Sequence, residues 1–147
     1  MKVELIDLKK RYLDEKKELL NCFQRVVGKG SLVLTDELAN FENKITKYTG
    51  AKYCLGLNSG TDALMMGLWA LGIKKGDEVI TSTISFIASA GAIFHLGAKP
   101  VFVDVCEDLN MDPDLIERSI TSKTKAIMPV HWSGKICKMD KIKKISK

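Results

Sequence analysis

The feature that most constrains the fold is an alternation of short apolar runs with segments of helical periodicity. Between residues 53 and 130, four runs of strand length are separated by helical segments. This order is typical of a parallel sheet, because each parallel pair needs a crossover connection. The runs are apolar without a break, as expected for strands covered on both sides. We therefore predict an α/β fold in which a mainly parallel sheet carries helices on both faces, an αβα sandwich.

Capping residues set several of the predicted boundaries. Thr35 is a predicted N-cap, and Asp112-Pro113 is a typical helix start. The apolar stripes of the first two helices are expected to be buried, and the almost wholly apolar third helix is expected to be deeply buried. The predicted helices cover residues 9–27, 35–50, 62–71 and 85–96, with others starting near 112 and 139, and the predicted strands cover 53–57, 78–81, 100–105 and 124–130.

Length and composition indicate an ordinary globular chain. Its 147 residues suit one domain with one core, and 46% hydrophobic and 28% charged residues are typical values. No apolar run reaches the roughly 18 residues that span a bilayer. The first ten residues lack the apolar core of a signal peptide. We therefore predict a cytoplasmic protein with no membrane partner.

The net charge of +5 would permit nucleic-acid binding, but the lysines are spread along the chain and are densest only at residues 138–147. A loosely basic surface equally suits an enzyme with anionic substrates, so we predict no nucleic-acid partner. The four cysteines form no C-x-x-C pair, which argues against a metal site. Cys54 and Cys106 lie in apolar runs and are expected to be buried and reduced.

The strongest chemical signal is the turn Asn58-Ser59-Gly60-Thr61 between a predicted strand and a predicted helix. The first amides of a helix have no partner within it and attract anions. Gly60 allows close approach of a ligand, while Ser59 and Thr61 add hydroxyl donors. These groups suit a phosphate, although the same residues could simply cap a buried helix. The turn is neither a G-x-G-x-x-G fingerprint nor a P-loop.

Five segments in order extend this signal over nearly the whole chain. Together they resemble the DegT/DnrJ/StrS family of sugar aminotransferases, and five matches in register make the resemblance specific. The segments are FENKITKYTGAKYCLGLNSGTDAL (41–64), GDEVI (76–80), SFIASA (85–90), GAKPVFVDV (97–105) and PVHWSG (129–134).

The resemblance implies a fold-type-I enzyme that uses pyridoxal 5'-phosphate. Family members transfer an amino group from an amino acid, usually glutamate, to a nucleotide-linked keto-sugar, and they supply amino sugars for polysaccharide biosynthesis. By this resemblance, Ser59, Gly60 and Thr61 would hold the cofactor phosphate. Phe86 would stack on the cofactor ring, the alternative being a core residue on its helix. Family members are dimers, so a homodimer is expected, with loop 28–34 as the candidate segment to reach the partner.

The resemblance also implies what residues 1–147 leave out. In the family, the acidic partner of the ring nitrogen, a phosphate-binding serine and the catalytic lysine all occur in segments that would follow Lys147. Residues 1–147 are therefore expected to be the N-terminal part of the large domain of a pyridoxal-phosphate-dependent transferase, from a truncated enzyme. We assign no catalytic residue, and we expect this part to be inactive and prone to self-association alone. Thr35, Ser82 and Ile84 depart from the family pattern.

Other interpretations remain open at this point. The chain could belong to a pyridoxal-phosphate-dependent sugar dehydratase, to a non-catalytic phosphate- or nucleotide-binding α/β module, or to an interaction module whose turn only caps a helix. His95 is interpreted as a helix-end residue and Asp104 as a loop organiser. His131 could face the crevice at a strand end, although a structural or indirect role is favoured. A metal site at His131 and Cys137 is not expected.

Overall fold

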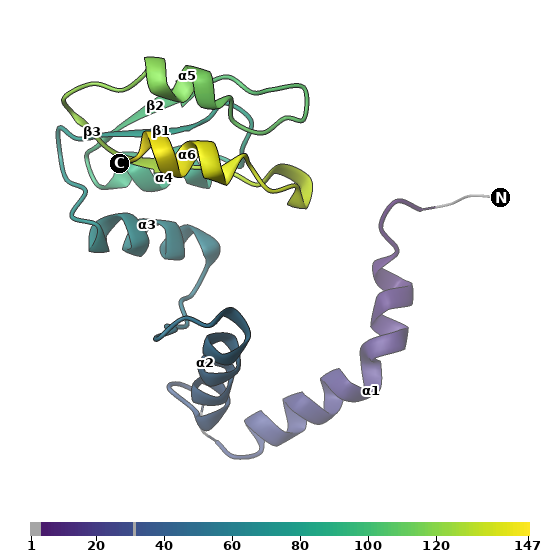
Figure 1. Cartoon of the computed structure of the whole chain (residues 1–147). Helices are drawn as coiled ribbons and strands as arrows, with labels where there is room; N and C mark the ends of the chain where they lie inside the picture. The colour runs from purple at the N-terminus through teal and green to yellow at the C-terminus, as the bar shows by residue number, and fades with distance from the viewer. Residues whose placement is uncertain (1–3, 31) are drawn as a thin grey trace. The chain divides into compact units, whose positions relative to one another are not determined.

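The computed structural model describes residues 4–30 and 32–147. The chain divides into two compact units, Met1–Gly56 and Leu57–Lys147 (Figure 1). No helix in the described residues is long and apolar enough to cross a membrane. The elements are α1 (Leu8–Val27), α2 (Asp36–Thr49), α3 (Gly60–Ala70), β1 (Glu78–Ser82), α4 (Ala88–His95), β2 (Lys99–Val103), α5 (Pro113–Arg118), β3 (Thr124–Met128), a 3₁₀ turn (Trp132–Gly134) and α6 (Met139–Ile145).

The first unit consists of α1 and α2, and local capping explains their limits. The Asp7 side chain accepts a hydrogen bond from the Lys10 amide (2.8 Å) at the start of α1. Thr35 caps α2 as predicted, with its hydroxyl 3.4 Å from the Leu38 amide. Gly50 ends α2 in the left-handed conformation (φ 73°), which glycine adopts without steric cost.

The apolar stripes of α1 and α2 are not buried, contrary to prediction. Within the described part of this unit, neither helix has a buried residue. Phe23 is 63% exposed and Tyr48 is 88% exposed. Helical periodicity predicts that a face is apolar but not what will cover it, and the described residues of this unit cover these faces only in part, as where Gly56 lies against Leu38.

The second unit is built on a parallel sheet of order β2-β1-β3. β1 lies in the centre, and all five of its residues are buried. Its apolar centre, Val79-Ile80, faces both helical layers, while the buried polar residues Glu78 and Thr81 have hydrogen-bond partners within the unit. Parallel strands joined through helices confirm the predicted α/β class.

Each face of the sheet has its own core cluster. On one face, Val79 packs in a cluster with Leu68 of α3 and Ile93 of α4. On the other face, Ile80 packs with Ile116 of α5 and Ile142 of α6. Adjacent strand residues point to opposite faces, so Val79 and Ile80 hold the two helical layers onto one strand. This arrangement is the predicted αβα sandwich.

The third helix is less buried than its sequence predicts. Leu68 is its one buried residue among those described, while Trp69 is 64% exposed. The helix packs against α4, and the described part of its own unit leaves its other sides open. The predicted deep burial is therefore wrong.

Residues 53–57 form no strand, which corrects a second prediction. An extended segment becomes a strand only when its backbone pairs with a neighbour, and no described strand pairs with this one. The helix predicted to begin at residue 85 begins at Ala88. The strand predicted to run through residue 130 ends at Met128.

The cysteines are free thiols, as expected, but their burial differs from the prediction. Cys54 and Cys106 are only half-buried, whereas Cys137 is the buried one. Burial raises the pKa of the Cys137 thiol, because the apolar core disfavours the thiolate. Cys137 packs in the core cluster beneath α5 and α6.

The Glu78 carboxylate joins the beginnings of all three strands. Its side chain accepts a hydrogen bond from the Thr121 hydroxyl (2.7 Å) just before β3, and another from the Lys99 ammonium group (3.2 Å) at the start of β2. Glu78 is only 7% exposed. The Thr121 hydrogen bond, followed by the Lys99 interaction, lowers the pKa of Glu78 below its usual value of 4.5.

We predict that Glu78 makes the stability of this unit depend on acid pH. Because the folded state lowers the pKa of Glu78, its contribution is complete above about pH 4.5 and is lost as pH falls through the folded pKa. Glu78→Gln should therefore reduce the difference in free energy of unfolding between neutral pH and about pH 3. Urea unfolding at both pH values measures this difference. Glu107→Gln is the control, and an equal pH dependence in all three proteins would contradict the role of Glu78.

Candidate functional site

The loops that follow the three strands meet at the carboxyl edge of the sheet. Because the strands are parallel, residues 83–87, 104–112 and 129–138 all leave from this edge. Ligands of open parallel sheets bind outside the carboxyl ends of the strands. A ligand site is therefore expected at the carboxyl edge of this sheet.

The turn at the start of α3 returns to the same edge. Residues 71–77 connect α3 to the amino end of β1, so the helix runs back along the sheet. Its 11 residues span about 16 Å, and the five residues of β1 span nearly the same length. The amino end of α3 therefore lies near the level at which β1 ends, on the α4 side of the sheet.

Ser59 acts as the N-cap of α3. Its hydroxyl oxygen accepts a hydrogen bond from the Asp62 amide (3.1 Å), and its proton can be donated to the Asp62 carboxylate (2.9 Å). The Asn58 side-chain amide donates to the same carboxylate oxygen (3.2 Å). The conformation of the turn is thus fixed from within, by the pattern of a helix cap.

Two backbone amides and one hydroxyl in this turn remain available to a ligand. No acceptor among the described residues lies on the amides of Gly60 and Thr61, or on the Thr61 hydroxyl. Gly60 is exposed, and a Cβ placed there would meet no heavy atom within 4 Å outside its immediate surroundings. The turn is therefore open, and these donors at the positive end of a helix fit a phosphate group. The Ser59 hydroxyl would have to rotate away from Asp62 to join them.

Phe86 lies in the loop that follows β1, two residues before α4. Its side chain is 74% exposed, so the alternative that it is a core residue on its helix is wrong. The ring borders a shallow hollow together with Phe102 of β2 and several hydroxyl side chains. The hydroxyls of Ser85 and Ser89 lie 2.6 Å apart and tie this loop to α4. An exposed ring on a fixed loop is able to stack on a planar ligand.

The structure also places the remaining candidates. His95 is the last residue of α4, as predicted for a helix-end residue. Asp104 organises its loop, because its carboxylate accepts from the Val105 amide (2.8 Å) and its carbonyl from the Asp112 amide (3.1 Å). His131 accepts a hydrogen bond from the Cys137 amide at Nδ1 (3.2 Å). No group of three potential metal ligands occurs in the described residues.

The sequence did not predict a role for Asn110, a buried polar residue that links two loops at the carboxyl edge. Asn110 is only 2% exposed, and its side chain links the loop after β2 to the loop after β3. A single buried asparagine in a loop has no periodic signature, so only the fold reveals it. Its neighbour Asp108 accepts hydrogen bonds from the Asn110 amide and from Lys135, which lower the pKa of Asp108.

The sequence profile of the DegT/DnrJ/EryC1/StrS aminotransferase family matches residues 13–147. The chain belongs to this family. The profile match covers the open turn, the Phe86 loop and the loop after β3, and the family resemblance predicted from the five segments is confirmed.

Individual DegT-family proteins match over nearly the whole chain. The UDP-2-acetamido-2-deoxy-3-oxo-D-glucuronate aminotransferase of Pseudomonas aeruginosa is 41% identical over 98% of this chain and 40% of its own length. The crystal structure of Streptomyces venezuelae DesV with a ketimine intermediate has a TM-score of 0.93 and 39% identity, covering 98% of this chain and 39% of DesV. Bacillus subtilis NtdA with bound cofactor PMP has a TM-score of 0.87 and 40% identity, covering 90% of this chain and 31% of NtdA. The chain thus spans about two fifths of the length of the curated relatives it matches.

We predict that Ser59→Ala destabilises the second unit by about 1 kcal/mol, because the capping hydrogen bond to the Asp62 amide is lost. Ser59→Thr should retain most of the stability, since threonine also caps helices. Urea unfolding measures the difference. Ser122→Ala removes an exposed hydroxyl outside any cap and serves as the control. A Ser59→Ala protein as stable as the wild type would contradict the capping role.

Proposed function

We propose that the chain supplies the cofactor phosphate-binding part of a pyridoxal-phosphate-dependent aminotransferase that acts on a nucleotide-linked keto-sugar. The observation that carries this proposal is the open turn at residues 59–61, whose two amides have no acceptor among the described residues, in a member of this family. The name of the Pseudomonas relative, an aminotransferase of a UDP-linked 3-oxo sugar, supports the substrate class. The bound PMP of NtdA supports the cofactor.

The proposal gives each residue of the site one task. The amides of Gly60 and Thr61 and the Thr61 hydroxyl donate hydrogen bonds to phosphate oxygens, and the positive end of α3 favours their negative charge. The Ser59 hydroxyl contributes after turning from Asp62. The Phe86 ring covers one face of the cofactor ring and excludes water from it. When bound, pyridoxal 5'-phosphate would supply the conjugated ring that carries the amino group and stabilises charge during its transfer.

Residues 1–147 are proposed to form the N-terminal part of the large transferase domain, since they span about two fifths of the curated relatives. The catalytic lysine of the family is then expected outside these residues, and this part alone is expected to be inactive. The amino donor is proposed to be an amino acid such as glutamate, the pathway polysaccharide biosynthesis, and the location cytoplasmic. A homodimer stays a prediction, for which the exposed residues 32–34 in loop 28–34 remain the candidate contact.

We predict that Thr61→Val raises the dissociation constant for pyridoxal 5'-phosphate about three- to tenfold, because one hydrogen bond to a charged oxygen is lost. Absorbance titration measures the constant, and competition by inorganic phosphate tests that the phosphate group is what is recognised. Thr49→Val is the control, because its hydroxyl bonds the Ile45 carbonyl in the other unit. Equal affinity in Thr61→Val and the wild type would argue against the phosphate site.

We predict that Gly60→Asp separates ligand binding from stability. The site has room for a side chain, and an acidic residue in the first turn of α3 is favourable to the helix. The free energy of unfolding should therefore stay equal or rise, while like-charge repulsion weakens binding of pyridoxal 5'-phosphate about tenfold or more. Gly60→Asn has the same size without the charge and should bind more tightly than Gly60→Asp. If both variants bind like the wild type, the turn is only a helix cap.

A further inference from the structure

The loop after β3 forms a tight turn at residues 130–137, and hydrogen bonds link its two ends. The Cys137 amide donates to His131 Nδ1 (3.2 Å), and the Cys137 thiol donates to the Val130 carbonyl (3.2 Å). Between them, Ser133 and Gly134 both have positive φ (51° and 81°). A serine in this conformation is uncommon and persists where surrounding contacts fix the backbone.

Asn110, in the neighbouring loop after β2, forms hydrogen bonds with the same turn. Its side-chain oxygen accepts from the Trp132 amide (3.1 Å) and lies 3.5 Å from the Cys137 sulfur, whose single S–H is shared with the Val130 carbonyl. Its side-chain nitrogen donates to the Lys135 carbonyl (3.2 Å). One buried carboxamide therefore satisfies donors and an acceptor at three positions of the turn, and an apolar replacement would leave these groups unpaired.

These contacts select one tautomer of His131. A backbone amide can only donate, so Nδ1 must be unprotonated, and in the neutral ring the proton then resides on Nε2. The His131 side chain is exposed and lies just beyond the carboxyl end of β3. Nε2 has no acceptor among the described residues, so its proton is available to a ligand at this edge.

We propose that Asn110 and the Cys137 amide position His131 so that its Nε2–H serves as a fixed hydrogen-bond donor to an oxygen acceptor of the ligand bound at the carboxyl edge. Asn110 is the positioning residue, and His131 is the residue that touches the ligand. The choice of pyridoxal 5'-phosphate as the probe rests on the proposed function. The tautomer itself is a property of the protein alone.

The tautomer can be measured directly, because the chain has only two histidines. Long-range proton–nitrogen correlation on the nitrogen-15-histidine-labelled chain, recorded at alkaline pH, should show His131 protonated at Nε2. His95→Gln assigns the signals, and His95, whose ring has no hydrogen bond among those described, provides the internal reference for tautomer exchange. A His131 signal with the same tautomer mixture as His95 would overturn the proposal.

Two variants test the role of Asn110. Asn110→Ala should shift the His131 tautomer mixture toward that of His95. Asn110→Asp keeps the acceptor for the Trp132 amide and removes the donor to the Lys135 carbonyl, so a smaller shift in the same direction is expected. This variant tests the role of Asn110 if Asn110→Ala does not fold. Circular dichroism verifies folding of each variant. An unchanged tautomer in a folded variant would overturn the positioning role of Asn110.

Ligand binding tests the donor role of His131. The side-chain nitrogen of glutamine can reach the position of Nε2, whereas that of asparagine reaches only the position of Nδ1. His131→Gln should therefore keep the affinity for pyridoxal 5'-phosphate within about twofold, and His131→Asn should lose about three- to tenfold. Equal affinity of the wild type and both variants would overturn the donor role.

The outcomes separate this inference from the phosphate site. If Thr61→Val binds normally while His131→Asn binds weakly, the phosphate site fails and the His131 donor stands. If Thr61→Val binds weakly and the His131 variants bind normally, the phosphate site stands and the His131 donor fails. Absence of any binding by the wild type overturns the donor role along with the proposed function, while the tautomer measurement still decides the positioning role.

Discussion

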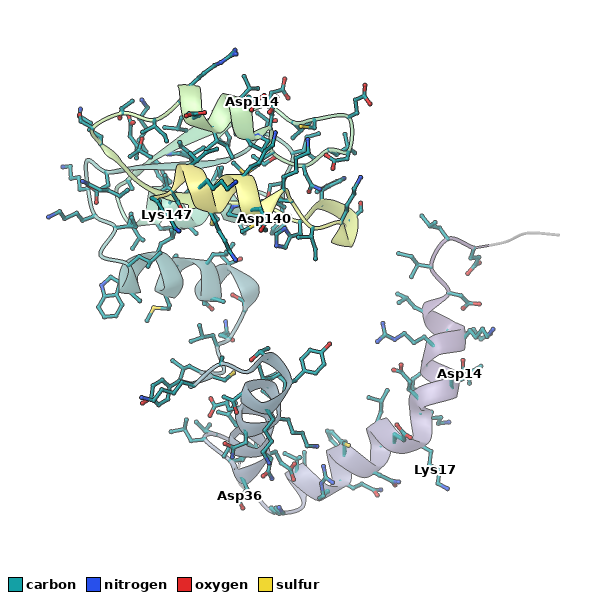
Figure 2. All side chains as sticks on the ribbon, in the orientation of Figure 1. Asp14, Lys17, Asp36, Asp114, Asp140 and Lys147 are labelled. Atoms are coloured by element: carbon teal, nitrogen blue, oxygen red, sulfur yellow. The ribbon has the colours of Figure 1, made fainter. Side chains whose placement is uncertain are left out.

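The parallel pairing of β1 with both β2 and β3 is the constraint on which the second unit depends. Pairing on both sides leaves β1 no exposed edge, and its two faces hold two helical layers through Val79 and Ile80. Because all three strands run the same way, their following loops must emerge at one edge. The chemistry of that edge is therefore a consequence of strand direction, while its particular residues are supplied by the loops. Figure 2 draws the side chains of this unit on its ribbon, with Asp114 on α5 and Asp140 on α6 labelled.

The two ends of the sheet have different electrostatic tasks. At the amino end, the Glu78 carboxylate receives hydrogen bonds from Thr121 and Lys99, so its charge is satisfied within the protein. At the carboxyl edge, the donors of Gly60 and Thr61 have no described acceptor. Satisfied polar groups favour a stable fold, whereas exposed donors at a helix start favour an external anion. In the proposed function, stability and binding are thus assigned to opposite ends of the same sheet.

The predictions that held depend on signals carried by a few adjacent residues. Thr35 as a cap, Gly50 as a stop and Asp112-Pro113 as a helix start are local choices of backbone conformation. The predictions that failed depend on partners distant in sequence. The segment 53–57 has strand composition but no paired neighbour among the described strands, and within the described residues the apolar sides of α1, α2 and α3 are only partly covered.

Residues of the candidate site show the same difference between local signals and contacts distant in sequence. The turn at residues 59–61 was predictable, because a capping serine, a glycine and a threonine follow one another in the sequence. Asn110 was not, because its partners Trp132, Lys135 and Cys137 are between 22 and 27 positions away. A buried carboxamide acquires a role only when the fold brings two loops to it. The residue that orients a donor can therefore be invisible in the sequence even where the donor itself, His131, lies within a family motif.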